Sequence, residues 1–145
     1  MDRGYIYLNK KSYLHNIEVL KNLSRKELCL VVKANAYGHG LEWAVKNAKE
    51  SGVKWFAVAS VDEGIEVKKV YGDSRVLLLA EPSITQLDNV KENNIDLTVY
   101  NESFIDTLIE TGDEFSVHLK IDTGMHRLGC PPEKFYNLHK KIADS

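Results

Sequence analysis

Residues 31–40 read VVKANAYGHG, and this stretch decides how the rest of the chain is interpreted. It places Lys33 at the end of an apolar, β-branched run and follows it with a segment in which Gly38 and Gly40 permit a tight turn. A lysine amine becomes a nucleophile toward an aldehyde in surroundings that favour its neutral form, and a neighbouring glycine-rich loop offers backbone N–H groups to a phosphate. The same arrangement also describes a solvated strand end, so the stretch alone leaves both interpretations open.

Five apolar, β-branched runs recur along the chain, and their starts lie 20 to 26 residues apart. They span residues 28–33, 54–59, 75–80, 95–100 and 115–122. Between the runs lie segments in which apolar residues have helical spacing, such as residues 41–50 and 103–110. Strands joined through helices at this spacing usually run parallel, with right-handed crossovers. The sequence therefore predicts an α/β fold.

Five parallel strands are compatible with an open doubly wound sheet or with part of a barrel. In the fifth run, apolar residues alternate with polar ones, Val117, Leu119 and Ile121 with His118, Lys120 and Asp122. A central strand of a doubly wound sheet is apolar on both faces, whereas a barrel strand can direct polar groups into the lumen near its carboxyl end. This alternation favours a partial (β/α)8 TIM barrel of about five parallel β-α units.

Outside the five apolar runs, the sequence predicts a short N-terminal strand and a helix, and it indicates no domain boundary. Residues 5–8, with the sequence YIYL, are predicted to form a short extra N-terminal strand, followed by a helix over about residues 11–23. No linker or low-complexity tract is visible, so residues 1–145 are expected to form one unit. A full barrel needs about 250 residues. We therefore expect either a truncated gene product or a partner polypeptide that supplies the remaining strands.

Composition and charge exclude several classes of function. The chain has 43% hydrophobic and 28% charged residues and a net charge of -2, and its 19 basic residues form no stripe that would predict nucleic-acid binding. No apolar run is long enough to span a membrane, and the first residues lack the apolar core of a signal peptide, so we expect a cytoplasmic protein. Cys29 and Cys130 are expected to be free thiols, and no Cys/His cluster predicts a metal site.

Two further segments carry recognisable motifs: residues 55–64 read WFAVASVDEG, and residues 117–129 read VHLKIDTGMHRLG. Together with residues 31–40, and in the same order, they resemble signatures of the alanine racemase family. The resemblance covers about residues 4 to 130. It implies a fold-type III pyridoxal-phosphate enzyme, in which a (β/α)8 barrel is followed by a β-rich domain. This chain would be the N-terminal part of that barrel, without the later strands and the β-rich domain.

The resemblance also implies roles for four residues of this sequence. Lys33 matches the lysine that is attached to pyridoxal 5'-phosphate and acts as a base on one face of the substrate. Tyr37 matches a tyrosine that binds the cofactor phosphate. Arg127 matches an arginine that contacts the cofactor's phenolic oxygen, a place that suits a permanently charged, rigid fork of donors. Lys120 matches a lysine that is carbamylated in many members, although a lysine pointing to solvent from a strand end remains an alternative.

The implied activity is the pyridoxal-phosphate-dependent interconversion of L-alanine and D-alanine, which supplies D-alanine for peptidoglycan. Full-length members are expected to be homodimers in which a tyrosine from the partner's β-rich domain is the second base. Because that domain lies outside these residues, we expect the chain alone to be inactive. Two alternatives remain: a non-catalytic module that binds or carries pyridoxal phosphate, and a racemase for serine or for a broad range of amino acids.

Overall fold

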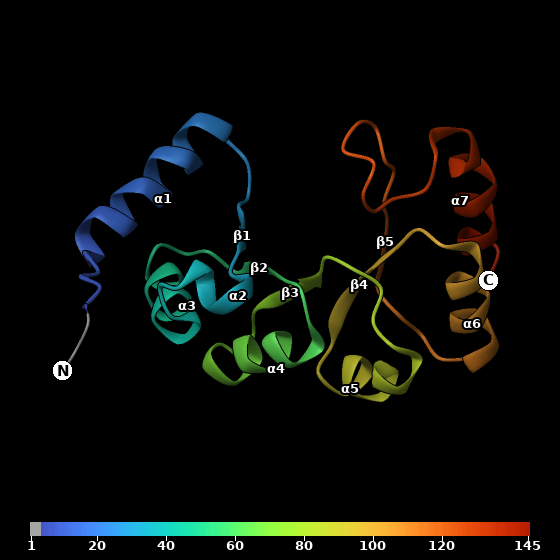
Figure 1. Ribbon diagram of the computed structural model, residues 1–145, viewed down its shortest axis with the longest axis horizontal. Coiled ribbons are helices and arrows are strands. Elements are labelled where there is room, and N and C mark those ends of the chain that lie inside the picture. The colour runs from blue at the N-terminus through green and yellow to red at the C-terminus, as the bar shows by residue number, and fades with distance from the viewer. Residues whose placement is uncertain (1–3) are drawn as a thin grey trace.

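Five short strands form one parallel sheet in the computed structural model, which describes residues 4–145 (Figure 1). The strands are β1 (Cys29–Val31), β2 (Trp55–Val58), β3 (Arg75–Leu78), β4 (Ile95–Val99) and β5 (Val117–Leu119). Their order in the sheet is β1-β2-β3-β4-β5, so each strand pairs with the next one along the chain. A doubly wound sheet reverses its strand order at a switch point, and this sheet does not. The prediction of a partial barrel is therefore confirmed.

The helices of the described residues are α1 (Lys10–Ser24), α2 (Lys33–Tyr37), α3 (Leu41–Glu50), α4 (Val61–Val70), α5 (Leu87–Glu92), α6 (Glu102–Thr111) and α7 (Phe135–Ala143), with short 3-10 turns η1 (Ile84–Gln86) and η2 (Pro132–Lys134). Helix α1 precedes β1, α2 is a short turn directly after β1, and the helices from α3 to α6 form an arc along one face of the sheet. Figure 1 shows α3, α4, α5 and α6 in succession around the sheet. Within residues 4–145, none of these helices combines the length and the apolar character needed to cross a membrane.

The core lies between the sheet and these helices. Alternate strand residues point toward the helices and are almost completely buried: Phe56, Val58, Val76, Leu78, Leu97 and Val99. Each such side chain contributes about 1.5–3 kcal/mol to the free energy of unfolding. Helix α4 approaches the sheet so closely that a Cβ added at Gly64 would lie 2.8 Å from Cδ1 of Ile95. The opposite face of the sheet carries apolar and polar residues together, among them Trp55, Arg75, Asp96 and His118.

The prediction of an extra N-terminal strand at residues 5–8 is wrong. The structure describes residues 4–9 as irregular, and Tyr5, Ile6 and Tyr7 are 96%, 75% and 84% exposed. A β-rich composition yields a strand only where a neighbouring edge can accept its backbone hydrogen bonds, and no strand among the described residues pairs with this segment. The following helix was predicted correctly, and the side-chain oxygen of Asn9 caps it by accepting from the Ser12 N–H at 3.0 Å.

Candidate active site

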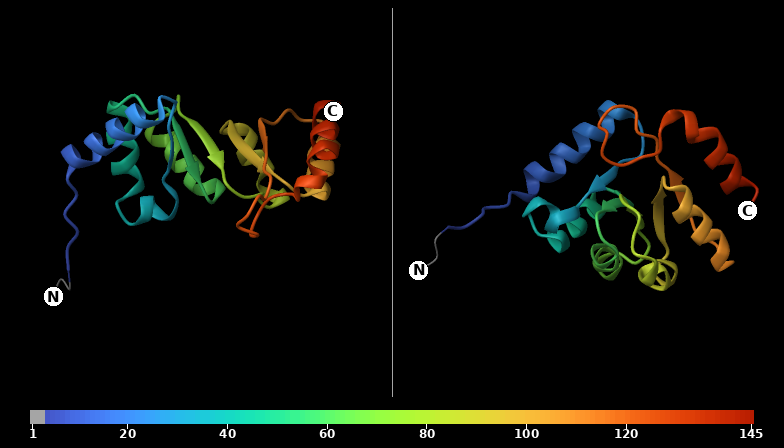
Figure 2. Two further views of the ribbon diagram at one scale, coloured as in Figure 1. Left: turned by 90° about the horizontal axis from the view of Figure 1, so that it is seen from above. Right: turned by 45° about the vertical axis from the view of Figure 1, so that its right-hand side comes forward.

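Two loops that carry the predicted site residues lie at the same edge of the sheet. One is the five-residue turn α2 (Lys33–Tyr37), directly after β1, and the other is the loop of residues 121–130 after β5. Because all five strands are parallel, their carboxyl ends meet at one edge. The left view of Figure 2 shows α2 and the loop of residues 121–130 projecting on that side. This is the edge at which barrel enzymes build their active sites.

Lys33 stands at the start of an unusual turn. The side chain is half-buried, and the four residues that follow, 34–37, have φ values of +52° to +54°, all in the left-handed region. None of these four is glycine, although the left-handed conformation costs a non-glycine residue about 1–2 kcal/mol. The sequence predicted a turn at this place, and it was expected to depend on Gly38 and Gly40. Strain of this kind persists only where the surrounding structure enforces it, and it clusters at functional sites.

Side chains from outside the turn and from the turn itself hold it in place. The Ala34 N–H donates to Oε1 of Glu63 at 2.6 Å, and the Leu41 N–H donates to Oδ1 of Asn35 at 2.7 Å. Nδ1 of His39 lies 2.9 Å from the Ala36 carbonyl oxygen. Sequence reasoning assigned no role to Glu63 or Asn35. A signal for Glu63 was available, because Ser60 and Glu63 have the spacing of a helix capping box.

Tyr37 ends the left-handed turn, and its side chain is 63% exposed. It lies four residues after Lys33, on the same loop at the carboxyl edge of the sheet. An exposed tyrosine hydroxyl at this place is free to donate a hydrogen bond to a ligand.

The second loop begins at Lys120, which follows β5 and is half-buried. Its backbone N–H donates to the Val99 carbonyl at 2.9 Å. The loop is closed at its far end, because the Cys130 N–H donates to the Lys120 carbonyl at 2.8 Å and the Asp122 N–H donates to the Cys130 carbonyl at 2.9 Å. Cys130 is buried, so both bonds are shielded from water.

Asp122 organises the interior of this loop. Its Oδ1 accepts hydrogen bonds from the His126 N–H at 3.0 Å and the Gly124 N–H at 3.1 Å. These two N–H groups, His126 first, hold the pKa of the Asp122 carboxyl below its ordinary value. The Asp122 carboxylate is therefore the acceptor around which this turn is formed.

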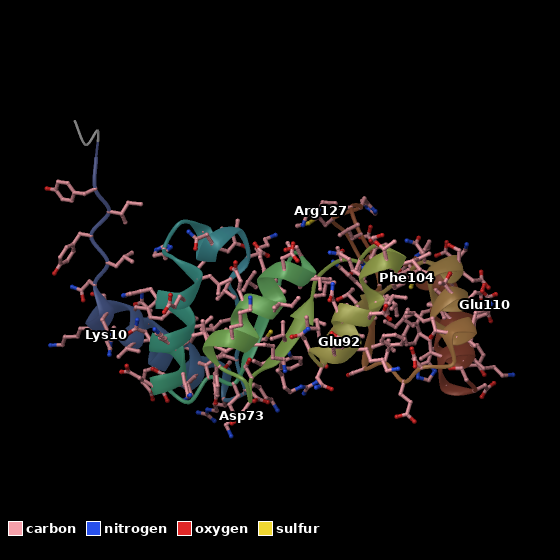
Figure 3. All side chains as sticks on the ribbon, turned by 90° about the horizontal axis from the view of Figure 1, so that it is seen from below. Lys10, Asp73, Glu92, Phe104, Glu110 and Arg127 are labelled. Carbon is pink, nitrogen blue, oxygen red and sulfur yellow. The ribbon has the colours of Figure 1, made fainter. Side chains whose placement is uncertain are left out.

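Arg127 lies on this loop and is exposed. Figure 3 places it at the same edge of the molecule as α2. Lys33 and Tyr37 follow the first strand of the sheet, whereas Lys120 and Arg127 follow the fifth. The structure therefore brings both pairs to one edge and leaves β2, β3 and β4 between them.

The face of the sheet that the helices leave open carries a polar cluster below this edge. Asp96 accepts from Nη2 of Arg75 at 2.7 Å, and Nε2 of His118 lies 3.5 Å from the same carboxylate oxygen. The Arg75 guanidinium also lies 4.5 Å from the centre of the Trp55 ring, and the rings of Trp55 and His118 are 5.7 Å apart. Of the polar residues predicted to face the barrel interior from β5, His118 does so, and it contacts Asp96 and Trp55 there.

Parallel β-α units wound in chain order, with a lysine and an arginine at the carboxyl edge, define this protein as part of a (β/α)8 barrel of the enzymatic type. Residues 8–145 match the family model described as "Alanine racemase, N-terminal domain", and the chain belongs to that family.

Relatives and solved structures agree with this assignment. The chain is 34% identical over 135 residues to alanine racemase from Helicobacter pylori strain J99, matching 89% of this chain and 36% of that protein. It is 36% identical over 151 aligned positions to an amino-acid racemase from Enterococcus faecalis, and this match covers 98% of this chain and 21% of that protein. The biosynthetic alanine racemase from Pseudomonas aeruginosa superposes with a TM-score of 0.85 at 29% identity, covering 92% of this chain and 38% of that one. The chain thus spans between about a fifth and two fifths of the length of these proteins.

Proposed function

We propose that this chain is the cofactor-attaching part of a pyridoxal-phosphate-dependent alanine racemase, an isomerase that interconverts L-alanine and D-alanine. The observation that carries the proposal is the place of Lys33, half-buried at the carboxyl edge of the sheet and directly before a strained left-handed turn, in a chain of this family. When bound, pyridoxal 5'-phosphate delocalises the negative charge that forms when the α-hydrogen of an amino acid is removed.

The residues at this edge fit such a cofactor in their chemistry. In the proposal, the Lys33 amine attaches it, the Tyr37 hydroxyl donates a hydrogen bond to its phosphate, and the Arg127 guanidinium donates to its phenolic oxygen. The exposure of Tyr37 and Arg127 at the same edge of the sheet supports these roles, because both side chains are available to a ligand. Lys33 Nζ then has a second task, the transfer of the α-proton on one face of the substrate.

We assign Lys120 a supporting role as a carbamate. A neutral lysine amine attacks carbon dioxide, forming an N–C bond and releasing a proton, and the product is an anion. An anion at Lys120 can hold Arg127 by a charge-assisted hydrogen bond. The half-buried position of Lys120, and the closed loop that connects it to Arg127, support this role. The alternative is an unmodified ammonium group at the strand end.

Racemisation needs a proton removed from one face of the α-carbon and returned to the other. A single lysine reaches one face, so in this proposal the second base comes from parts of the enzyme outside these residues. The proposal also includes what the family implies for the whole protein: a cytoplasmic homodimer that supplies D-alanine for peptidoglycan. Because the Enterococcus faecalis relative is named an amino-acid racemase, a wider substrate range is the second candidate.

A chimera tests the proposed activity. Residues 8–145 would replace the matching part of the Helicobacter pylori alanine racemase, and the formation of D-alanine from L-alanine would be followed with added pyridoxal phosphate. We expect activity in the chimera and none in its Lys33→Ala variant, with both proteins folded as judged by circular dichroism. Equal rates in the two would contradict the proposal. Turnover of L-serine as fast as L-alanine would favour the wider substrate range.

A further inference from the structure

We propose that Glu63 is a positioning residue for Lys33, acting through the left-handed turn. This inference rests on the proposed function. One carboxylate joins two loops: Oε1 accepts from the Ala34 N–H at 2.6 Å, and Oε2 accepts from the Ala59 N–H at 2.9 Å. Ala34 is the residue after Lys33, so its N–H belongs to the peptide group that links the two. Glu63 therefore fixes the orientation of the peptide plane next to the Cα of Lys33.

The contacts of Glu63 depart from those expected at the start of a helix. Ser60 is the N-cap of α4, and its hydroxyl oxygen accepts from the Glu63 N–H at 3.3 Å. In a capping box, the glutamate at this position returns to the N–H of the N-cap residue itself. Here the Glu63 carboxylate accepts from the backbone N–H groups of Ala59 and Ala34 instead. The Glu63 side chain thus binds the loops that follow β1 and β2. The positive end of the α4 helix dipole favours the negative charge of its carboxylate.

The hydrogen bond from the Ala34 N–H to Glu63 lies at the first residue of the left-handed turn. Ala34 is the first of four consecutive non-glycine residues with positive φ, a conformation that persists only when its surroundings enforce it. A carboxylate that accepts from a backbone N–H makes a stronger bond than a neutral acceptor. Loss of this bond would let the turn relax, and the Lys33 amine would lose its fixed position although Lys33 itself is unchanged.

Glu81 offers a matched control within the same sheet. Its Oε1 accepts from the Tyr100 N–H and from the Asn101 N–H, both at 2.8 Å, and its other oxygen accepts from the Asn101 side-chain amide. It ties the segment after β3 to the segment after β4, as Glu63 ties those after β1 and β2. Glu81 thus has the same chemistry as Glu63 at a position removed from Lys33.

The experiment compares the unmodified 145-residue chain with Glu63→Gln and Glu81→Gln. Glutamine keeps the size of the side chain but replaces one acceptor oxygen with an NH2 group, so it can accept from only one of the two backbone N–H groups. Amide hydrogen exchange is measured by NMR without cofactor. In the unmodified chain the N–H groups of Ala34 and Ala59 should exchange slowly although both residues are exposed. In Glu63→Gln one of them should exchange at least about tenfold faster, and in Glu81→Gln neither should change.

The same three proteins are then incubated with pyridoxal phosphate and reduced with borohydride, and the pyridoxyl label on Lys33 is normalised to the folded fraction. We expect the label to fall at least about tenfold in Glu63→Gln relative to Glu81→Gln. Equal labelling of Lys33 in the two variants, or rapid exchange of both N–H groups in the unmodified chain, would overturn the role of Glu63 alone. An unmodified chain that shows no preference for Lys33 would overturn the proposed function, and the cofactor role of Glu63 with it.

Discussion

The backbone N–H of Cys130 donates to the carbonyl oxygen of Lys120 at 2.8 Å, which ties the end of the Arg127 loop to the strand end that carries the lysine. The loop therefore returns to its own starting point. Its conformation depends on a few contacts between backbone groups and on the carboxylate of Asp122. These contacts can be tested one at a time.

The pH dependence of this loop should follow the ionisation of Asp122. Hydrogen bonds from His126 and Gly124 hold the pKa of its carboxyl below the ordinary value of 3.8. A lowered pKa means that the stabilising contribution is fully present above pH 3.8 and is lost as the pH falls through the lower pKa of the folded state. The protection of the Gly124 and His126 amides, measured as the exchange rate relative to the intrinsic rate at each pH, should fall in that acidic range. Asp122→Ala should show this low protection already at neutral pH, and protection that survives in this variant would contradict the assignment.

Gly129→Ala should destabilise the same loop. Gly129 has a φ of +134°, and an added Cβ would lie 2.6 Å from the Asp122 backbone nitrogen, which cannot move aside as a flexible side chain could. We expect a loss of about 2 kcal/mol or more in the free energy of unfolding, measured by urea denaturation. Gly124→Ala is the control on the same loop, because no heavy atom lies within 4 Å of the Cβ it would add. Equal losses in the two variants would show that the close contact has no effect.

Carbamylation of Lys120 should be visible by NMR with 13C-labelled bicarbonate. We expect a carbamate signal that is absent in Lys120→Ala and that persists in Lys46→Ala, because Lys46 is an exposed helix residue already paired with Glu42. The signal should grow with bicarbonate concentration. An unmodified Lys120 at neutral pH and saturating bicarbonate would contradict the carbamate and leave a plain ammonium group at the strand end.

The isolated 145-residue chain should exchange the α-hydrogen of alanine slowly and form hardly any D-alanine. The physical reason is that one lysine serves one face of the α-carbon only. Exchange is followed by proton NMR in deuterium oxide with added pyridoxal phosphate, and D-alanine by a chiral assay. Rapid racemisation by the isolated chain would require a second base within these residues, with Tyr37 and His39 as the first to be substituted.

Much of the fold could be predicted because its signals are local. The five runs of β-branched residues mark the five strands, and the polar alternation in β5 indicated the barrel, which the strand order confirms. The observed strands are shorter than the predicted runs, so that Lys33 and Lys120 lie just beyond the strand ends. Residues 5–8 were mispredicted because strand formation depends on a partner edge, which the segment's own sequence does not reveal.

The left-handed turn could not be predicted, since alanine, asparagine and tyrosine have no local preference strong enough to impose it over four residues. Its conformation depends in part on Glu63, which is distant in sequence and comes close only when the first two β-α units pack together. The resemblance assigned Lys33 and Arg127 to one cofactor, and the structure places the loops that carry them at one edge of the sheet. The spacing of Ser60 and Glu63 marks a helix start, but the contacts that Glu63 and Asn35 make around the turn after Lys33 became visible only in three dimensions.

The central claim is that Lys33 is the residue that attaches pyridoxal phosphate, and covalent trapping tests it most directly. The chain is incubated with pyridoxal phosphate, reduced with borohydride, digested, and mapped by mass spectrometry, beside a Lys33→Ala variant and a Lys46→Ala control. We predict that the pyridoxyl group is found mainly on the peptide that contains Lys33, that Lys46→Ala labels normally, and that Lys33→Ala loses this label. A label spread evenly over the surface lysines, or a Lys33→Ala variant that incorporates as much pyridoxyl group as the unmodified chain, would contradict the account.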